Sequence, residues 1–561
     1  MPRILLLLFC AAYVLPGFVG RAPWKSADMT SFGYMLALAQ GQGSFFAPQL
    51  MGLAPETDSL LSYWLGAMAI KLGNGWLSPD VAVRVPFVGL LVVTLYAVWY
   101  ATYYFARSPR AQPVAFAFGG EAAPTDYARA IADGGLLAFI ACLGLAQLSH
   151  ETTPAVVQLG CVAACFYALA AMPYRVLSPV IVGLLGMLGL TLSGQPVVAA
   201  LLGLGGAIIH AFDSTPDPVS GTRRIAWTWA IALCTLLMLA LATSLSLWGD
   251  NAHRSQHVVQ DTRDLAQLLL WFTWPAWPLA IWTLWRWRLQ LLGGQLSRHL
   301  AMPLWFLLVT LGSLWFTPST DRALLLGLPA LACLAAFALP TLGRSVAALI
   351  DWFTLLFFCG CAVSIWVIWI AMQTGIPSAP AANVQRLFPG FAPHFSVAPF
   401  LIAVGASVSW AWLVKWRVGR HRAALWKSLV LPASGAALCW LLLTTLWLPL
   451  LDFARSYVPM IHSAKQVFKD ATCVHVHGLN RGEIAALQFH GQTLARPLTA
   501  HPECRWLMAD GNAITSLPAG VEINHWALRS RVRHPADRSD KNADFLIYER
   551  IAVDALRAPL Q

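Results

Sequence analysis

The stretch ALLLGLPALACLAAFALP, residues 323–340, contains no charged side chain and is long enough to cross a lipid bilayer as a helix. The preceding segment, residues 317–322, is polar and contains a proline, so it separates this run from another apolar run at 301–316. The chain contains about thirteen such runs, which predict a polytopic α-helical membrane protein. The predicted spans centre on residues 4–20, 84–106, 134–149, 154–172, 175–192, 196–212, 225–247, 267–285, 301–316, 323–340, 348–373, 396–416 and 428–450.

The composition of the whole chain agrees with this prediction. Of its 561 residues, 58% are hydrophobic and 11% are charged, and the mean hydropathy is +0.61. A soluble globular protein has about 25% charged residues, so these values exclude a conventional cytosolic enzyme, a disordered chain and a small disulfide scaffold. The net charge of +11 could suggest nucleic acid as a partner. Most of the cations lie in short loops between apolar runs, however, so membrane orientation explains them better and we expect no nucleic-acid partner.

The orientation of the chain follows from loops that alternate in their cation content. By the positive-inside rule, the cation-rich loops and the start of the chain face the cytoplasm. An odd number of spans then places residues 21–83 and the tail after residue 450 on the opposite side. The first run could also be a cleaved signal peptide, but no good cleavage site follows it, so we predict a retained helix. The cation-rich loops carry Arg107, Arg110, Arg129, Arg175, Arg223, Arg224, Arg286, Arg288, Arg298, Arg344, Lys415, Arg417, Arg420, Arg422 and Lys427.

The sequence divides into two regions. Residues 1–450 form the predicted transmembrane domain, including an outer loop, residues 21–83, with two moderately apolar helical segments that suit the membrane interface. Residues 451–561 are more polar and contain no run long enough to span, so we predict a small extramembrane α/β domain. Its short β-like stretches and one helical pattern lie at 473–479, 504–508, 526–532 and 545–551, and at 481–491.

The tail has no Walker loop, GxSxG or HExxH motif. Cys473 and Cys504 are its only cysteines, and each opens a predicted strand. We expect them to form a disulfide in an oxidising compartment, the alternative being two buried thiols. Four histidines could bind a metal, although scattered surface histidines are the simpler interpretation, so we assign no metal ligand. These histidines are His475, His477, His490 and His501.

Two acidic residues lie just outside predicted spans on the same membrane face. Asp28 ends the stretch RAPWKSAD, residues 21–28, and Glu151 lies in a short loop before Pro154. A carboxylate at the interface is costly to desolvate, so a partner or a function is expected. Two carboxylates at one face suit the handling of a substrate hydroxyl. Each could equally cap the helix that follows it, and the residue types leave both alternatives open.

Several stretches resemble, in order, motifs of bacterial GT-C glycosyltransferases, and the group most similar is that of the aminoarabinose transferases and protein O-mannosyltransferases. The resemblance implies a GT-C-like fold in the bacterial inner (cytoplasmic) membrane, with a periplasmic tail. It also implies transfer of a hexosyl or pentosyl group from a polyprenyl-phosphate carrier to a lipid such as lipid A or lipopolysaccharide, a glycan or a protein. The stretches are PWKSAD (23–28), PQLMG (48–52), LLSYWLGA (60–67), SHETTP (149–154), WFTWPAWPLAIW (271–282) and SLWFTPSTDRALLLGLPALACL (313–334).

The resemblance also implies roles for individual residues. Asp28 matches the family's catalytic acid, and Glu151 matches a second acid that is more often Asp in relatives. The family's acid–basic–proline step is replaced by Glu56-Thr57-Asp58-Ser59, so the basic contact to the donor phosphate is missing there. No particular cofactor is implied, and a divalent metal stays a candidate. Cations predicted on the outer side could bind the phosphate instead, and these are Lys25, Arg254, Arg263 and Arg322.

A polytopic transporter or a flippase for lipid-linked sugars would have a similar composition. Such proteins often show internal repeats and ionisable groups in the middle of spans. We find no clear repeat, and Asp351 lies near the cytoplasmic end of its span. A scaffold without activity is a third class. The sequence favours a transferase but identifies neither the sugar nor the acceptor.

Overall fold

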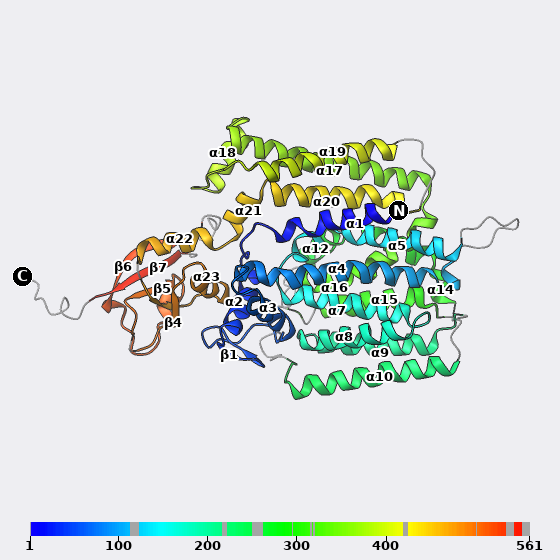
Figure 1. Ribbon diagram of the computed structural model, residues 1–561, viewed down its shortest axis with the longest axis horizontal. Coiled ribbons are helices and arrows are strands. Elements are labelled where there is room, and N and C mark those ends of the chain that lie inside the picture. Colours follow the sequence, from blue (N-terminus) through cyan, green and yellow to red (C-terminus); the bar gives the residue numbers. More distant parts are fainter. Residues whose placement is uncertain are drawn as a thin grey trace, which may run out of the picture.

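The computed structural model describes residues 2–112, 123–215, 221–248, 262–293, 296–314, 317, 320–418, 425–469, 471–500, 502–534 and 544–551. Long helices lie side by side in a bundle, and a small domain with a β-sheet is attached at one end (Figure 1). This arrangement confirms the predicted fold class, a polytopic helical membrane protein with a small C-terminal α/β domain.

Every predicted span contains a helix. The run predicted at 267–285 is divided into two helices at Pro275, which has no N–H to continue the helical hydrogen bonds. The polar segment before residue 323 likewise separates two helices, as predicted. The bundle helices are α1 (Arg3–Val14), α4 (Pro79–Ala106), α5 (Pro124–Ala141), α7 (Pro154–Ala171), α8 (Leu177–Leu192), α9 (Pro196–Phe212), α10 (Gly221–Ser244), α12 (Thr262–Phe272), α13 (Ala276–Arg286), α15 (Arg298–Ser313), α16 (Thr320–Ala338), α17 (Arg344–Thr374), α19 (Val397–Val418) and α20 (Val430–Thr445), with shorter helices α6 (Leu145–Leu148), α14 (Arg288–Leu292) and α18 (Ser378–Leu387) between them.

Length and hydropathy separate these helices into two groups. Within the described residues, 7 helices are long and apolar enough to cross a membrane. Three more apolar helices are shorter, at Arg3–Phe18, Leu177–Leu192 and Pro196–Phe212. The total of about thirteen spans stays a prediction. The seven lie at Pro79–Ala106, Pro154–Ala171, Arg224–Ser244, Thr320–Thr341, Arg344–Thr374, Val397–Arg417 and Lys427–Thr445.

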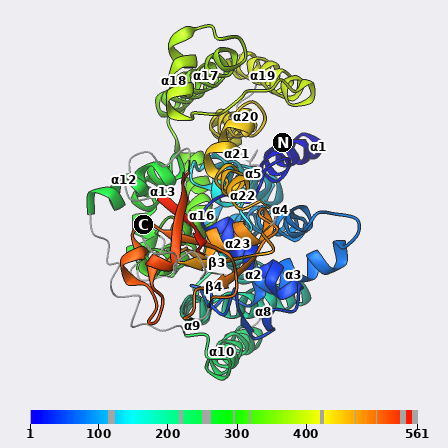
Figure 2. The ribbon, with the colours of Figure 1, turned by 90° about the vertical axis from the view of Figure 1, so that its left-hand side faces the viewer.

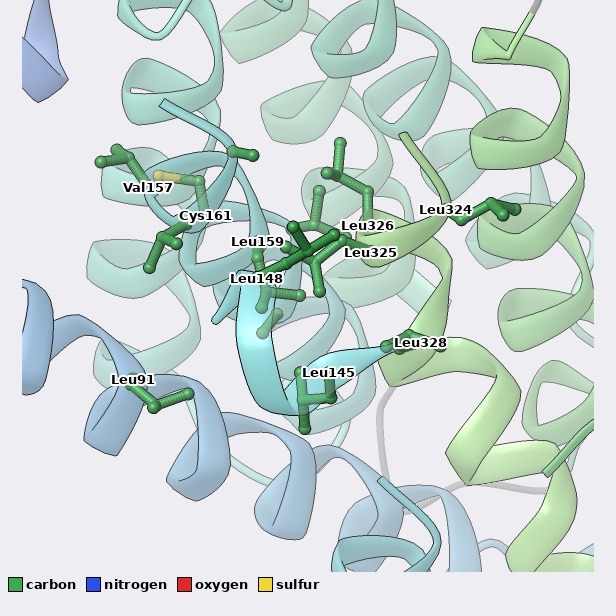
Figure 3. Packing of buried hydrophobic residues seen from close by; sticks show 14 of the residues in the cluster. Leu91, Leu145, Leu148, Val157, Leu159, Cys161, Leu324, Leu325, Leu326 and Leu328 are labelled. Carbon is green, nitrogen blue, oxygen red and sulfur yellow. The ribbon is translucent and has the colours of Figure 1, made fainter. Parts of the chain in front are cut away.

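The helix α16 lies at the centre of the bundle. Of its most apolar window, 94% is buried, against 11% for Arg224–Ser244 at the edge. Small residues let neighbouring helices approach α16 closely. A Cβ added at Gly327, for example, would lie 2.9 Å from Oγ1 of Thr310 on α15. Figure 3 shows leucines of α16, including Leu325, gathered beside Leu148 of α6 and Leu159 of α7.

The outer loop forms two helices, α2 (Ala27–Ala39) and α3 (Leu61–Gly73). It also forms a short antiparallel hairpin whose two strands, β1 (Gly43–Ser44) and β2 (Ala47–Pro48), have two residues each. Both helices occur where the sequence indicates helical segments. They lie at the end of the bundle that carries the tail domain, whereas the start of the chain lies at the opposite end (Figure 1). The arrangement agrees with a loop and a tail on one side of the membrane; which compartment that side faces stays a prediction.

The tail begins with two helices, α21 (Leu448–Arg455) and α22 (Val458–Val467), and the boundary predicted at 450/451 falls inside α21. A five-stranded sheet in the order β4-β3-β5-β7-β6 follows, with β3 parallel to β4 and β5 and the other pairs antiparallel. The elements are β3 (Cys473–His477), α23 (Arg481–Phe489), β4 (Leu494–Pro497), β5 (Trp506–Asp510), β6 (Trp526–Arg533) and β7 (Asp544–Arg550).

The sequence pattern missed β4. This four-residue strand has the sequence LARP, which contains none of the β-branched and aromatic residues that identify a strand. It lies at the edge of the sheet, where it pairs with β3 alone and can end in a proline. Cys473 and Cys504 are joined by a disulfide, with their Cα atoms 5.6 Å apart. His475 is buried beside this bond, where its Nδ1 contacts the Pro497 carbonyl at 3.0 Å and its Nε2 accepts from the Cys504 amide at 3.0 Å. This histidine therefore ties strands together and has no ring nitrogen left for a metal.

Candidate functional site

A cavity of about 640 Å³ lies where the outer loop and the tail domain meet the bundle. Its wall is built from α2, α3, α7, α9, α15, α16 and the start of α23. Polar and charged residues, among them Arg322 and Arg481, form one part of the wall. Val197, Leu201 and Leu308 also line the cavity and are exposed. The wall therefore includes accessible apolar side chains as well as charged ones.

Arg322 presents a guanidinium group to this cavity from the first turn of α16. Its Nη2 lies 3.0 Å from Oε2 of Glu151, and its Nε is buried without a hydrogen-bond partner among the described residues. The Glu151 carboxylate lies behind Arg322, and its Oε1 accepts from Gln147 over 3.4 Å. Burial raises the pKa of Glu151, the charge of Arg322 opposes this rise, and the charge of Asp28 adds to it. Glu151 is not itself one of the described lining residues. A buried acid that pairs with a cavity-lining arginine is a candidate general base.

Asp28 has a different environment. Its side chain is 3% exposed, and, like Glu151, it is not one of the described residues that line the cavity. Its Oδ1 accepts from the amide and from Oγ1 of Thr152, both over 2.7 Å. Its Oδ2 accepts from Nη1 of Arg21 over 2.7 Å and from the amide of Trp24 over 3.1 Å. Burial alone would raise the pKa of Asp28, but the charge of Arg21 and the hydrogen bonds from Thr152 and Arg21 outweigh it and lower the pKa.

The interpretation of these acids as helix caps is wrong. The helix α2 begins at Ala27 with Ser26 at the N-cap position, and within the described chain the carboxylate of Asp28 bonds to Thr152, Arg21 and Trp24 instead of an α2 amide. Thr153 is the N-cap residue of α7, so Glu151 does not cap that helix either.

The sequence reasoning missed Arg21, although this residue opens the stretch that contains Asp28. Arg21 also donates from Nε to the carbonyl of Gly17 over 3.0 Å and from Nη2 to the carbonyl of His150 over 2.6 Å. Arg21 and Asp28 together therefore join the end of the first span, α2 and the loop at residues 149–153. The sequence did contain a signal for this ion pair. Arg21 lies close to the predicted end of the first span and only seven residues before Asp28, and charged groups at a membrane boundary need a partner.

His150 is a structural residue of the same junction. Its ring contacts the rings of Tyr13, Phe18 and Trp440, with centroids 5.4, 5.0 and 4.8 Å away. A Cβ at Gly17 would lie 2.3 Å from the imidazole, so only glycine fits there. Burial lowers the pKa of His150 to about 4, which keeps the ring neutral at physiological pH.

The remaining sequence candidates lie elsewhere. Neither Lys25 nor Arg263 is among the described residues that line the cavity. Lys25 faces the tail domain, with its Nζ 3.4 Å from Nδ1 of His534, and Arg263 is exposed on α12. Arg254 and His501 lie outside the described residues. The described ranges contain no group of three His, Cys, Asp or Glu residues arranged to hold a metal.

No family model and no curated protein matches this sequence. Crystal structures of ArnT from Cupriavidus metallidurans do match the structure. The ArnT bound to undecaprenyl phosphate superposes with a TM-score of 0.59 at 13% identity, over 100% of both chains. The apo ArnT gives a TM-score of 0.58 at 13% identity, over 100% of this chain and 99% of its own. The chain has the ArnT fold.

The match confirms, for the fold, the resemblance to GT-C aminoarabinose transferases. The ArnT fold extends over the whole chain, so the tail belongs to the shared architecture together with the bundle. At 13% identity, most side chains differ between the two proteins. The site residues therefore have to be argued from this chain's own geometry.

Proposed function

We propose that this chain is an integral-membrane glycosyltransferase that moves a sugar from a polyprenyl-phosphate carrier to an acceptor on the periplasmic face. The observation that carries the proposal is the cavity, whose wall contains both the cation Arg322 and exposed apolar side chains such as Leu201 and Leu308. A polyprenyl phosphate has the same two parts, an anionic head and an isoprenoid chain. The undecaprenyl phosphate bound to ArnT, which has this fold, supports the same class of carrier.

The proposed reaction places Arg322 and Glu151 in complementary roles. The acceptor oxygen attacks the anomeric carbon of the sugar, the bond from that carbon to the phosphate oxygen breaks, and polyprenyl phosphate leaves. Arg322 compensates the charge of the leaving phosphate, and Glu151 takes the proton of the acceptor hydroxyl. When Arg322 binds phosphate, Glu151 loses part of its counter-charge, so donor binding would itself make Glu151 a stronger base.

Asp28 fits a positioning role better than the role of the base. Four donors already occupy its two oxygens, and its lowered pKa makes it a weak proton acceptor. Through Thr152 it fixes the loop at residues 149–153 and therefore the adjacent Glu151. We propose that Asp28 is required because it holds Glu151 opposite Arg322.

The decisive experiment is a transfer assay with the purified full-length chain in liposomes. Undecaprenyl phosphates carrying different hexoses or aminopentoses are supplied with lipid, glycan or protein acceptors. Appearance of free undecaprenyl phosphate together with glycosylated acceptor is the expected result. Arg322→Gln and Arg322→Lys serve as matched variants, because lysine keeps the charge but not the fork geometry. Movement of labelled carrier across the bilayer with no bond cleavage would instead support a flippase.

The periplasmic location of the site depends on the predicted orientation. A reporter that is active only outside the cytoplasm should be active when fused after Gln561 and silent when fused after Arg298. The reverse pattern would place Glu151 on the cytoplasmic face and overturn the proposal for a periplasmic acceptor. Membrane fractionation in a bacterial host should place the chain in the inner membrane.

A further inference from the structure

Two charged side chains from distant parts of the sequence meet at the cavity wall. Arg481, the first residue of α23, donates from Nη1 to Oε1 of Glu56 over 2.8 Å and from Nε to the carbonyl of Ala54 over 3.0 Å. Arg481 and Glu56 both line the cavity. Their side chains are 31% and 68% exposed, so both stay accessible. The tail domain thus supplies part of the wall of the proposed active site.

The position of Arg481 is fixed by close packing of α23 on α2, which Figure 2 shows lying together at the outer end of the bundle. A Cβ added at Gly33 of α2 would lie only 2.4 Å from Cβ of Ala485, so glycine is required for this approach. Phe32 and Phe489 meet edge to face, with centroids 4.7 Å apart. The start of α23 is therefore held in a fixed position at the cavity wall by its packing against α2.

The two arginines of the wall have different electrostatic surroundings. Among the described lining residues, Arg322 and Arg481 are the cations and Glu56 is the carboxylate. Arg322 pairs with Glu151 over 3.0 Å, and Oδ1 of Asp321 lies 4.0 Å from its Nη1, but neither acid is among the described lining residues. Arg481 pairs with Glu56, which does line the cavity, so this pair presents no net charge there. A phosphate would therefore be attracted more strongly by Arg322 than by the Glu56–Arg481 pair.

A sugar has the opposite requirements, because it is rich in hydroxyl groups that donate and accept hydrogen bonds. The guanidinium of Arg481 can donate to such hydroxyls, and the carboxylate of Glu56 can accept from them. Asn480 and Thr57 also line the cavity, but the Asn480 side chain caps α23 and the Thr57 hydroxyl lies 3.3 Å from that of Tyr63, so the argument rests on Arg481 and Glu56. We propose that Arg481 and Glu56 bind the glycosyl group of the donor, so that the tail domain determines which sugar is accepted. This inference rests on the proposed glycosyltransferase function.

The inference is tested by comparing a carrier with and without its sugar. Binding of undecaprenyl phosphate, and of the same carrier bearing hexoses or aminopentoses, is measured with the full chain in nanodiscs. Arg481→Gln and Glu56→Gln should weaken binding of the preferred glycosylated carrier by about 10–100-fold and leave the bare carrier nearly unchanged. Arg322→Gln should weaken both. The control Arg496→Gln removes a surface ion pair with Glu503 in the same domain and should affect neither.

A charge-swapped variant, Glu56→Arg with Arg481→Glu, separates sugar binding from a purely structural contact. The swap keeps an ion pair between the outer loop and α23. If the pair only holds these two segments together, the swapped variant should therefore bind glycosylated carriers like the wild type. We expect it to remain defective with glycosylated carriers. Restored sugar binding in the swap, or equal weakening of bare and glycosylated carriers by Arg481→Gln, would overturn the inference alone. A wild-type chain that binds neither carrier and transfers no sugar would instead overturn the proposed function.

Discussion

Asp28 and Glu151 are both buried carboxylates at the outer end of the bundle, yet their surroundings differ. Asp28 has four hydrogen-bond donors and a buried arginine, Arg21, and its pKa is lowered. Glu151 has one arginine, Arg322, that also faces the cavity, and its pKa is raised. A carboxylate with four donors holds structure together, whereas a carboxylate whose ion-pair partner also faces the cavity can change its protonation when that partner binds a ligand. We therefore propose a stabilising role for Asp28 and a role in the chemistry for Glu151.

The largest expected effect is on catalysis, from Glu151→Gln. The substitution keeps the shape of the side chain and removes its ability to accept a proton, so initial transfer rates should fall by about 10²–10⁴-fold. The melting temperature in detergent should change little, because Arg322 is next to the cavity and can be solvated. The surface variant Glu503→Gln is the control. Wild-type rates for Glu151→Gln would remove Glu151 from the mechanism.

The next effect is on stability, from Asp28→Asn. Asparagine cannot balance the charge of Arg21, so a buried cation is left unpaired and the free energy of unfolding should fall by about 3–5 kcal/mol. Denaturant unfolding in detergent measures this loss. The double variant Asp28→Asn with Arg21→Gln removes both charges and should recover much of the stability. If Asp28→Asn is as stable as the wild type, the stabilising role of the Asp28–Arg21 pair is wrong.

A smaller loss is expected from Thr152→Val, which removes the hydroxyl donor to Asp28 but keeps the backbone one. A hydrogen bond to a charged group is worth about 1.5–3 kcal/mol of unfolding free energy. The neighbouring Thr153 is a matched control, because its buried Oγ1 has no hydrogen-bond partner among the described residues. Thr153→Val should leave stability unchanged or slightly higher. Equal losses in both variants would show that Thr152 does not stabilise Asp28 specifically.

The smallest effect concerns pH. The transfer rate requires ionised Glu151, whose pKa is raised, so the rate should fall with decreasing pH at values above the ordinary range of a glutamate. The lowered pKa of Asp28 contributes stability above the ordinary pKa of an aspartate, and that stability is lost only as pH falls toward the lower folded value. Activity should therefore disappear at a higher pH than stability. The transfer rate and the free energy of unfolding should be measured against pH in the same buffers. Loss of both at the same pH would contradict the prediction.

Local patterns in the sequence predicted most of the helices and strands. Apolar runs near bilayer length have one stable solution in lipid, a helix, so every predicted span contains one. The alternating stretches of the tail likewise predicted four of the five strands of its sheet, and the missing one was the short edge strand β4. Asp28 and Glu151 stood out as acids at a membrane boundary, because such groups need a partner.

The positions of helices inside or at the edge of the bundle, and the contacts between distant polar groups, could not be predicted from the sequence. The central span Thr320–Thr341 and the peripheral span Arg224–Ser244 have nearly equal mean hydropathies of 2.2 and 2.1, yet 94% and 11% of their windows are buried. Lipid and protein interior are equally apolar, so hydropathy cannot distinguish them. The pairing of Glu56 with Arg481, across 425 residues, depends on how the whole chain folds back on itself. A local sequence pattern does not indicate which distant residues will be in contact.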